Sequence, residues 1–362
     1  MPESARIRRG TGIKKQCPKA PPGAAADCRA QVTTLHRQRA GRALTLVVAL
    51  AAIAGTLGSL GYLAWWLELF AHFRPQYALS LAIGGACLLA LRRPGVGLAA
   101  LVLAAVNAMP LMHYYYSPPR GAPGGDGPAI KALLANVYFH NGRHDLLLEY
   151  VRGAQPDVAV FLEVTPQWTV ALRTLADSLP YQAQAGDVFV ASRKPLLGLR
   201  ALPLSATGAM AVIFFVDAGA GPVAIIGAHA NWPLGAKIAA SRNRELSMLA
   251  DMARATPGPV LLLGDLNITA FSPVFPALLA RAGLADCAAG RGYHPTWPAW
   301  FPPLYMQIDH CLAGAGLEVT EFATGPYVGS DHYPLEVTLR LRAPATAGPG
   351  LTASRAPRTF RR

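Results

Sequence analysis

Polar residues follow several apolar, strand-like runs in this sequence, and their types suit acid–base or metal chemistry. They are Asn136, Glu163, His229, Asp265, Asn267, Asp309, Asp331 and His332. Strands buried on both faces are near-continuous apolar runs, so a polar residue at a strand end emerges on one rim of the sheet. Active sites commonly lie on such rims. The pattern therefore predicts an active site assembled from several strand ends.

These residue types could hydrolyse a phosphate ester. That reaction needs a cation near the phosphate oxygens, a base for the attacking water and donors for the developing charge. Hard divalent ions such as Mg²⁺ take carboxylate and amide oxygens, so a set of one Glu, one Asn and one Asp is adequate. Glu163 is the best candidate ligand. The sequence has no Cys/His cluster with zinc spacing.

Asp265 and Asn267 lie two residues apart after the run Val260–Leu263. A brief extended stretch would aim both side chains the same way. One could take a proton from water while the other holds the water or the phosphate. The alternative is an Asx-type turn that closes the strand.

Two histidines are further candidates. His229 could contact the phosphate as a cation or donor, or it could be structural. His332 adjoins Asp331, and Asp309 is the natural carboxylate to fix the tautomer of His332.

The N-terminal part of the chain has the composition of a membrane domain. The whole sequence is 52% hydrophobic and only 15% charged, and Ala43–Leu67 contains no charged residue. That run is long enough to span a bilayer and too far from the N-terminus for a typical signal peptide. Gln76–Leu91 and Pro94–Met112 complete a predicted domain of three transmembrane helices over residues 43–113.

Lys and Arg predict the orientation of these spans. Residues 1–42 are rich in both and are expected to form a disordered cytoplasmic tail, with Arg92 and Arg93 also inside. Three spans from a cytoplasmic start place the chain after Met112 outside the cytoplasm. The predicted location is the cell (inner) membrane, multi-pass, with the lipid bilayer as a partner and a periplasmic or extracellular catalytic domain.

The net charge of +13 does not by itself indicate nucleic-acid binding. The positive charge gathers in residues 1–42 and in residues 342–362, a tail that is expected to be disordered. Residues 129–341 are close to neutral, whereas binding to a long polyphosphate by counterion release favours a basic domain. Nucleic acid is possible but not favoured as a partner.

A Pro/Gly-rich linker, residues 114–128, precedes a region in which strand-like and helical patterns alternate. Strands are predicted at Ala132–Tyr138, Asp157–Leu162, Val188–Ala191, Ala211–Val216, Val223–Ala228, Val260–Leu263, Gln307–Leu312 and Leu335–Leu341. Helices are predicted at Asp145–Arg152, Trp168–Ser178, Ile238–Arg254 and Pro273–Ala282. Some strand pairs lack an intervening helix, which favours an α/β sandwich of packed sheets flanked by helices. Cys287 and Cys311 in this region could pair.

The motifs resemble those of the endonuclease/exonuclease/phosphatase superfamily. They are, in order, Asn136, Gln155–Glu163, Gly264–Asn267, Ile308–His310 and Ser330–Pro334, and the resemblance covers residues 129–341. It implies a four-layer, DNase I-like α/β sandwich and dependence on Mg²⁺, with Mn²⁺ possible.

The resemblance also implies roles for single residues. It places Asn136, Glu163 and Asp331 at the metal, His229 at the phosphate, and Asp309 as the partner of His332, which stabilises the phosphoryl group. The three spans further resemble bacterial membrane-anchored members that are linked to glycopeptide resistance and act on polyprenyl pyrophosphates.

Some features weigh against a DNA-specific enzyme. Many nuclease members carry a second polar residue where this chain has Tyr138, and the core lacks an obvious long insertion to grip a duplex. Candidates for a phosphate-facing basic patch are Arg193, Lys194, Arg242 and Arg244, although the last two could be solvated helix charges.

The Pro-rich aromatic stretch His294–Met306 lies just before Ile308. It is expected to form a loop that could hold a lipid tail or reach the bilayer, or that could pack into the core instead.

The sequence thus predicts a membrane-anchored, divalent-metal-dependent phosphoesterase that acts outside the cytoplasm on a phosphate-bearing substrate. A lipid phosphate or pyrophosphate, such as a polyprenyl carrier, is the leading substrate. The alternatives are a membrane-tethered endonuclease or exonuclease, a phospholipid phosphodiesterase, and an inactive binding module.

Overall fold

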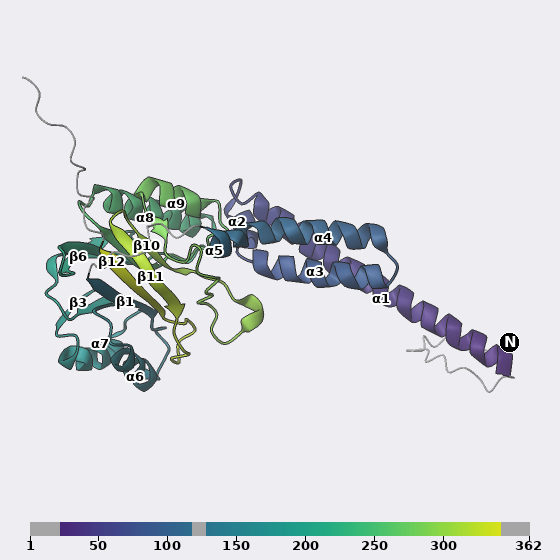
Figure 1. Cartoon of the computed structure of the whole chain (residues 1–362), viewed down its shortest axis with the longest axis horizontal. Helices are drawn as coiled ribbons and strands as arrows, with labels where there is room; N and C mark the ends of the chain where they lie inside the picture. The colour runs from purple at the N-terminus through teal and green to yellow at the C-terminus, as the bar shows by residue number, and fades with distance from the viewer. Residues whose placement is uncertain (1–21, 118–127, 342–362) are drawn as a thin grey trace, which may run out of the picture. The chain divides into compact units, whose positions relative to one another are not determined.

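The computed structural model describes residues 22–117 and 128–341, with side chains from residue 33 onward (Figure 1). These residues divide into two compact units, 22–53 with 78–106, and 54–77 with 107–117 and 128–341. Most of the predicted linker, and the predicted tails at 1–21 and 342–362, lie outside the described residues.

The first unit consists of apolar helical segments. They belong to α1 (Pro22–Ser59), α3 (Arg74–Ala90) and α4 (Pro94–Ala108). The segments pack through small residues, because a β-carbon at Gly84 would overlap Val48. α1 begins within the segment that was expected to be disordered, where Ala and Arg favour a helix.

Two helical stretches of the described residues, Thr33–Ser59 and Pro94–Tyr116, are long and apolar enough to cross a membrane. α3 has 17 residues and is shorter than either stretch. Three spans were predicted, and length and composition support two of them.

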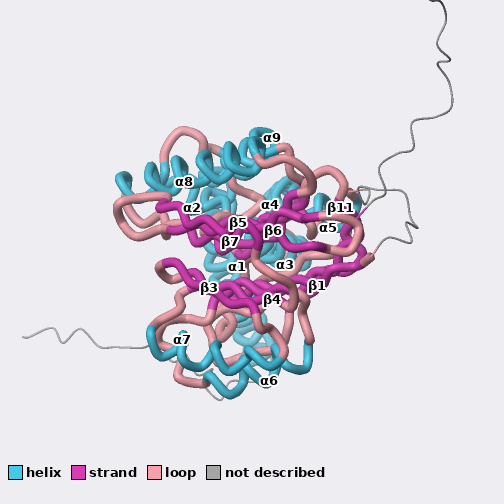
Figure 2. Tube along the Cα trace, turned by 90° about the vertical axis from the view of Figure 1, so that its left-hand side faces the viewer, coloured by secondary structure: helices cyan, strands magenta, loops and turns pink. Residues whose placement is uncertain are grey.

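The second unit is a four-layer α/β sandwich, as predicted (Figure 2). The first sheet has the order β11 (Leu317–Thr324), β12 (Leu335–Leu341), β1 (Ala129–Asn136), β2 (Val158–Leu162), β4 (Val188–Ser192) and β3 (Tyr181–Ala185). The second has the order β5 (Leu197–Pro203), β6 (Met210–Asp217), β7 (Pro222–His229), β8 (Val260–Asp265), β10 (Asp309–Ala313) and β9 (Ala285–Asp286).

Helices cover the outer face of each sheet (Figure 2). The first sheet is covered by α6 (His144–Ala154) and α7 (Pro166–Arg173), which continues into η2 (Thr174–Asp177). The second is covered by α8 (Ala236–Ala255) and α9 (Val274–Ala282). The four predicted helices match these elements to within a few residues. The one difference is that the end of the helix predicted at Trp168–Ser178 is the 3₁₀ turn η2.

Alternate residues of the central strands enter different cores, which explains their unbroken apolar sequences. In β2, Val160 packs into the core between the two sheets, whereas Phe161 packs against α6 and α7. A disulfide between Cys287 and Cys311 lies in the core between the sheets. The two cysteines that could pair are therefore bonded to each other.

The second unit also contains short helical segments that adjoin the apolar helices in the sequence. They are α2 (Trp65–Ala71), η1 (Met109–Leu111) and α5 (Met112–Tyr116). Tyr114 of α5 is completely buried in the core between the sheets, and the backbone carbonyls of His113 and Tyr114 accept hydrogen bonds from Gly290 and Gly292. These contacts attach α5 to the sandwich.

Candidate active site

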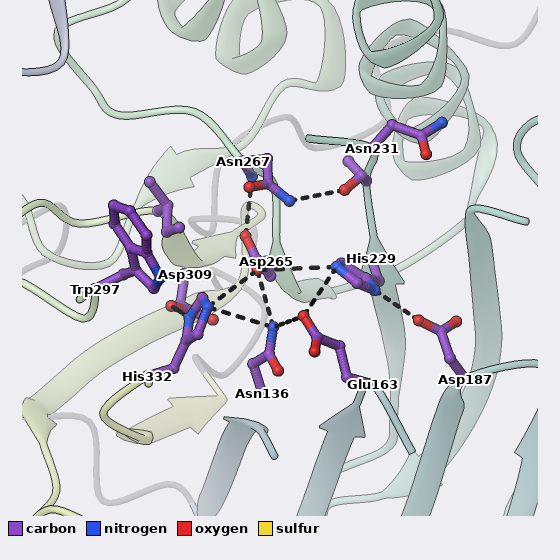
Figure 3. A network of polar contacts seen from close by, with 12 residues as sticks. Asn136, Glu163, Asp187, His229, Asn231, Asp265, Asn267, Trp297, Asp309 and His332 are labelled. Carbon is purple, nitrogen blue, oxygen red and sulfur yellow. Dashed lines mark hydrogen bonds and ion pairs between the residues drawn. The ribbon is translucent and has the colours of Figure 1, made fainter. Parts of the chain in front are cut away.

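The polar residues predicted from sequence meet at one end of the sandwich (Figure 3). In the second sheet, Asp265 pairs in register with both His229 and Asp309, so neighbouring strands place the three side by side. In the first sheet, Asn136 ends β1 beside Leu162, which places Glu163 next to it.

The two sheets contribute to the site together. The segment that carries Asp331 and His332 precedes β12, and β12 runs antiparallel to β1. That segment therefore meets the end of β1 where Asn136 lies. The structure brings all the predicted site residues to this end, although it does not test their individual roles.

Asn136 connects the two halves of the site. Its Nδ2 donates to Glu163 Oε1 at 2.9 Å and to Asp265 Oδ2 at 3.1 Å. Its Oδ1 accepts the backbone N–H of Tyr138, and its own carbonyl accepts a hydrogen bond from Ser330 Oγ at 2.7 Å. The side chain is almost completely buried. Asn136 thus holds one carboxylate from each sheet in place.

His332 is oriented by Asp309, as predicted from sequence. His332 Nδ1 lies 2.7 Å from Asp309 Oδ2, which leaves Nε2 facing Asp265 Oδ2 at 3.8 Å. Burial lowers the pKa of His332, but the charge and hydrogen bond of Asp309, with the charge of Asp265, outweigh it and raise the pKa to about 10. A protonated His332 can donate to an anionic oxygen.

His229 forms a second imidazole–carboxylate pair that the sequence analysis missed. Its Nδ1 lies 2.6 Å from Asp187 Oδ2, and its Nε2 lies 3.9 Å from both Glu163 Oε1 and Asp265 Oδ2. Burial lowers the pKa of His229, but its hydrogen bond to Asp187 and the charges of the nearby carboxylates raise the pKa to about 9. Asp187 immediately precedes β4, and Glu163 immediately follows β2. Because β2 and β4 are antiparallel neighbours, the two residues lie side by side, which only the pairing of these strands could have indicated.

The loop after β8 is shaped by close contacts. A β-carbon at Gly264 would collide with the carbonyl oxygen of Ala228, so β7 and β8 approach each other only with glycine there. Asn267 adopts a left-handed φ of 49°, donates its backbone N–H to Asp265 Oδ1 and donates from Nδ2 to the Ala230 carbonyl. Glu163 also has a positive φ, 60°. Such conformations concentrate where a site fixes the backbone.

The carboxylate cluster fits a divalent cation. Glu163 and Asp265 present carboxylate oxygens that lie within 4.8 Å of each other and of a ring nitrogen of His332. Burial and the charge of Asp309 raise the pKa of Asp265 to about 6, so a cation would stabilise its ionised form.

The remaining predicted ligands lie around this group. Asp331 Oδ1 is buried without a hydrogen-bond partner, 4.0 Å from His332 Nε2, while Asp331 Oδ2 accepts from Trp297 Nε1. Asn136 directs its donor nitrogen toward the carboxylates. Its predicted role as a metal ligand stays a prediction.

A cavity of about 630 Å³ opens from this cluster. Its polar lining includes Glu163, Asp265 and His332. Apolar and aromatic residues form much of the remaining wall, together with polar residues such as His140, Thr207 and Asn231. The apolar and aromatic residues include Leu69, Phe139, Trp232, Pro233, Trp297, Met306 and Ile308. The polar cluster therefore adjoins apolar surface within one cavity.

The four basic residues proposed as a phosphate-facing patch do not line this cavity. Arg193 donates to the Gln155 carbonyl and approaches Asp157, and Lys194 and Arg244 are exposed. Arg242 is completely buried and bound to Glu68, so it is neither a solvated helix charge nor a phosphate ligand. Pairing with a carboxylate compensates its burial.

Comparison with known families agrees with this geometry. The sequence profile of the endonuclease/exonuclease/phosphatase family matches residues 133–332, more than half of the chain. The chain belongs to this family. Members of the endonuclease/exonuclease/phosphatase family are hydrolases of phosphoesters that depend on divalent metal ions.

Solved structures support the same fold. An endonuclease/exonuclease/phosphatase from Beutenbergia cavernae is 20% identical, with a TM-score of 0.51, and the match covers 59% of this chain and 72% of that chain. One from Bacteroides vulgatus is 15% identical (TM-score 0.50; 59% and 99% covered), and truncated Caenorhabditis elegans TDP2 is 18% identical (TM-score 0.50; 59% and 98% covered). A search of curated protein sequences gave no significant match.

Proposed function

We propose that this family member is a membrane-anchored phosphoesterase that hydrolyses a lipid phosphate or pyrophosphate outside the cytoplasm. The observation that carries the proposal is the cavity, in which the carboxylates and imidazoles of the site adjoin apolar walls. A substrate that joins an anionic head to a hydrocarbon chain matches both surfaces. A polyprenyl pyrophosphate is such a molecule.

Aromatic side chains at the cavity and on the neighbouring loop favour a hydrocarbon partner. Trp232 and Phe139 line the cavity and remain 60% and 53% exposed. On the loop after Trp297, Trp300 is 69% exposed and Phe301 is 40% exposed. Large exposed apolar side chains close to a site commonly mark a surface for an apolar ligand or for a membrane.

The reaction is the addition of water to phosphorus and cleavage of the bond from phosphorus to the leaving oxygen. From a pyrophosphate the products are inorganic phosphate and the lipid monophosphate. Asp265 accepts the proton of the attacking water, and Asn267 helps to orient that water. His332, held by Asp309, donates to a phosphate oxygen through Nε2, and His229, held by Asp187, does the same from the other side.

A divalent cation, Mg²⁺ or alternatively Mn²⁺, would be held by Glu163 and Asp331. When bound, it would neutralise negative charge on the phosphate and stabilise the charge that develops during cleavage. Asn136 keeps Glu163 and Asp265 in place through Nδ2. The unpartnered Asp331 Oδ1 supports this choice of ligand.

The membrane part of the proposal follows from the apolar helices and the charge distribution. Two stretches are long and apolar enough to cross a bilayer, and α3 would be a third, shorter span. With the basic N-terminus in the cytoplasm, the sandwich lies outside. The disulfide between Cys287 and Cys311 supports this location, because disulfides persist in oxidising compartments.

Changing the exposed aromatic residues tests the lipid substrate. The triple variant Trp232→Ser, Trp300→Ser and Phe301→Ser is compared with the unchanged full chain in detergent micelles with Mg²⁺. The substrates are a long-chain polyprenyl pyrophosphate and a short soluble analogue. KM for the long chain is expected to rise about tenfold or more, because each buried CH₂ group contributes about 0.8 kcal/mol. KM for the short analogue should change little.

Tyr181→Ser provides a matched control. Tyr181 is 43% exposed and pairs with Ser192. Ser192 is the last residue of β4, whereas Asp187 lies just before the first. This change should leave both substrates unaffected. Equal losses on the long and short substrates in a folded triple variant would contradict a role for these aromatic residues in binding a hydrocarbon chain.

A further inference from the structure

The short helix α2 makes a buried ion pair with the catalytic sandwich. Glu68 Oε1 and Oε2 each lie 2.7 Å from Arg242 Nη2 of α8. Both side chains are buried, with Arg242 completely inaccessible. Glu68 Oε1 also accepts from Ser272 Oγ at 2.6 Å. Glu68 directly follows the uncharged run Ala43–Leu67, and it lies outside the segment that matches the family profile.

Arg242 carries this contact into the active site. Its Nη1 donates to the backbone carbonyl of Asn267 at 2.8 Å, and its Nε donates to Asn243 Oδ1. Asn267 is the residue whose backbone N–H binds the carboxylate of Asp265. A continuous set of hydrogen bonds therefore runs from Glu68 through Arg242 and Asn267 to Asp265.

A second contact joins α2 to the same loop. His72, at the C-terminal end of α2, lies 2.9 Å from Thr269 Oγ1 through Nδ1, and both residues are buried. Leu69 and His72 also line the catalytic cavity. Thus α2 holds residues 267–272 at several points and supplies part of the cavity wall.

We propose that Glu68 and Arg242 are positioning residues for the catalytic loop, so that α2 completes the active site. Glu68 fixes the guanidinium of Arg242, which in turn fixes the carbonyl of Asn267 and the left-handed turn that aims Asp265 and Asn267. The inference rests on the proposed phosphoesterase activity. A loop left free to move would misplace the group that receives the proton of water, and small displacements of catalytic groups cost rate.

The test uses the full chain in detergent and the double variant Glu68→Leu with Arg242→Met. Replacing a buried ion pair by apolar residues of similar volume commonly preserves folding, so the variant keeps a packed core while it loses the bond to Asn267. Asp251→Asn is the matched control. Asp251 of α8 accepts two hydrogen bonds from Arg281 of α9, and the Asn substitution breaks this ion pair. The pair is exposed and does not contact the catalytic loop.

Two readouts separate positioning from simple stability. With a polyprenyl pyrophosphate and Mg²⁺, kcat of the double variant is expected to fall about ten- to a hundredfold with KM within about twofold. Hydrogen–deuterium exchange should become faster in residues 265–272 and remain unchanged in the other central strands. The Asp251→Asn protein should match the unchanged chain in both measurements.

An unchanged kcat in a folded double variant would overturn the proposal, even if exchange becomes faster. If the unchanged chain hydrolyses no lipid pyrophosphate, the proposed function fails. The hydrogen–deuterium exchange measurement then decides the inference by itself, and unchanged exchange in residues 265–272 of the double variant would overturn it. If the double variant does not fold, the single variant Glu68→Gln, which retains an acceptor oxygen, should also have a lower kcat. An unchanged kcat of Glu68→Gln would contradict the proposal.

Discussion

Individual carboxylates of the site are expected to carry catalysis while adding little to folding. Glu163→Gln and Asp265→Asn each remove a charge with little change of volume. Each should lower turnover by about two orders of magnitude or more, because a metal ligand or a base is lost. Thermal unfolding should show that both variants remain folded, since removing charge from a buried acidic cluster relieves repulsion. Near-normal turnover of the Asp265→Asn protein would remove that residue from the mechanism.

The sequence was sufficient to locate most of the site, with Asp309 as the partner of His332, but not every residue that orients it. Asn136 and Asp265 end apolar strands, Glu163 follows one and Asp309 begins one. Such positions can be recognised along the chain. Asp187 could not be recognised without knowing that β4 returns antiparallel to β2. Arg242 was interpreted as a solvated helix charge or part of a phosphate-facing patch. Its burial could not be predicted, because its carboxylate partner, Glu68, lies far away in the sequence.

The attachment of α2 predicts a dependence of stability on pH. Burial, and the charge of Arg242, lower the pKa of His72 from 6.5 to about 3. Above pH 6.5 His72 is neutral in the folded and unfolded chain, so it adds no pH dependence. Below pH 6.5 His72 is protonated in the unfolded chain, whereas in the folded chain it stays neutral until about pH 3. The free energy of unfolding therefore falls as the pH is lowered through this range, by at most ~1.4 kcal/mol per pH unit.

Thermal unfolding between pH 7 and pH 5 measures this effect. The unfolding temperature of the unchanged chain should fall more steeply than that of His72→Gln, which retains a polar group near Thr269 but does not titrate. Identical slopes for the two proteins would show that His72 is not held neutral in a buried position.

At the level of elements, central strands were easier to predict than edge strands. β2 and β8 are buried on both faces, so their sequences are unbroken apolar runs. β3, β5 and β11 lie at sheet edges. β5 is largely exposed, β3 is half-buried with exposed residues, and β11 carries several exposed residues. These three strands, and the two-residue β9, were missed because an exposed edge imposes no continuous apolar pattern.

For the whole molecule, the distribution of Lys and Arg predicts that the sandwich lies outside the cytoplasm. A reporter enzyme that is active only outside the cytoplasm, fused after Leu341, should be active in cells. A reporter that works only in the cytoplasm should be silent at the same position. The reverse result would show that the proposed three-span topology is wrong. The sequence could not decide whether α3 crosses the membrane, because its 17 residues are at the short end of spanning helices.

We propose that this family member uses a divalent metal ion to hydrolyse a lipid-linked phosphate. The most direct measurement compares two substrates of the full chain in detergent micelles with Mg²⁺. Phosphate release from a long-chain polyprenyl pyrophosphate is measured beside nicking of supercoiled DNA. We expect phosphate release that EDTA abolishes and that Asp265→Asn lowers by about a hundredfold or more, with no DNA cleavage above that variant's background. Metal-dependent DNA nicking without phosphate release from the lipid would overturn the proposed lipid substrate.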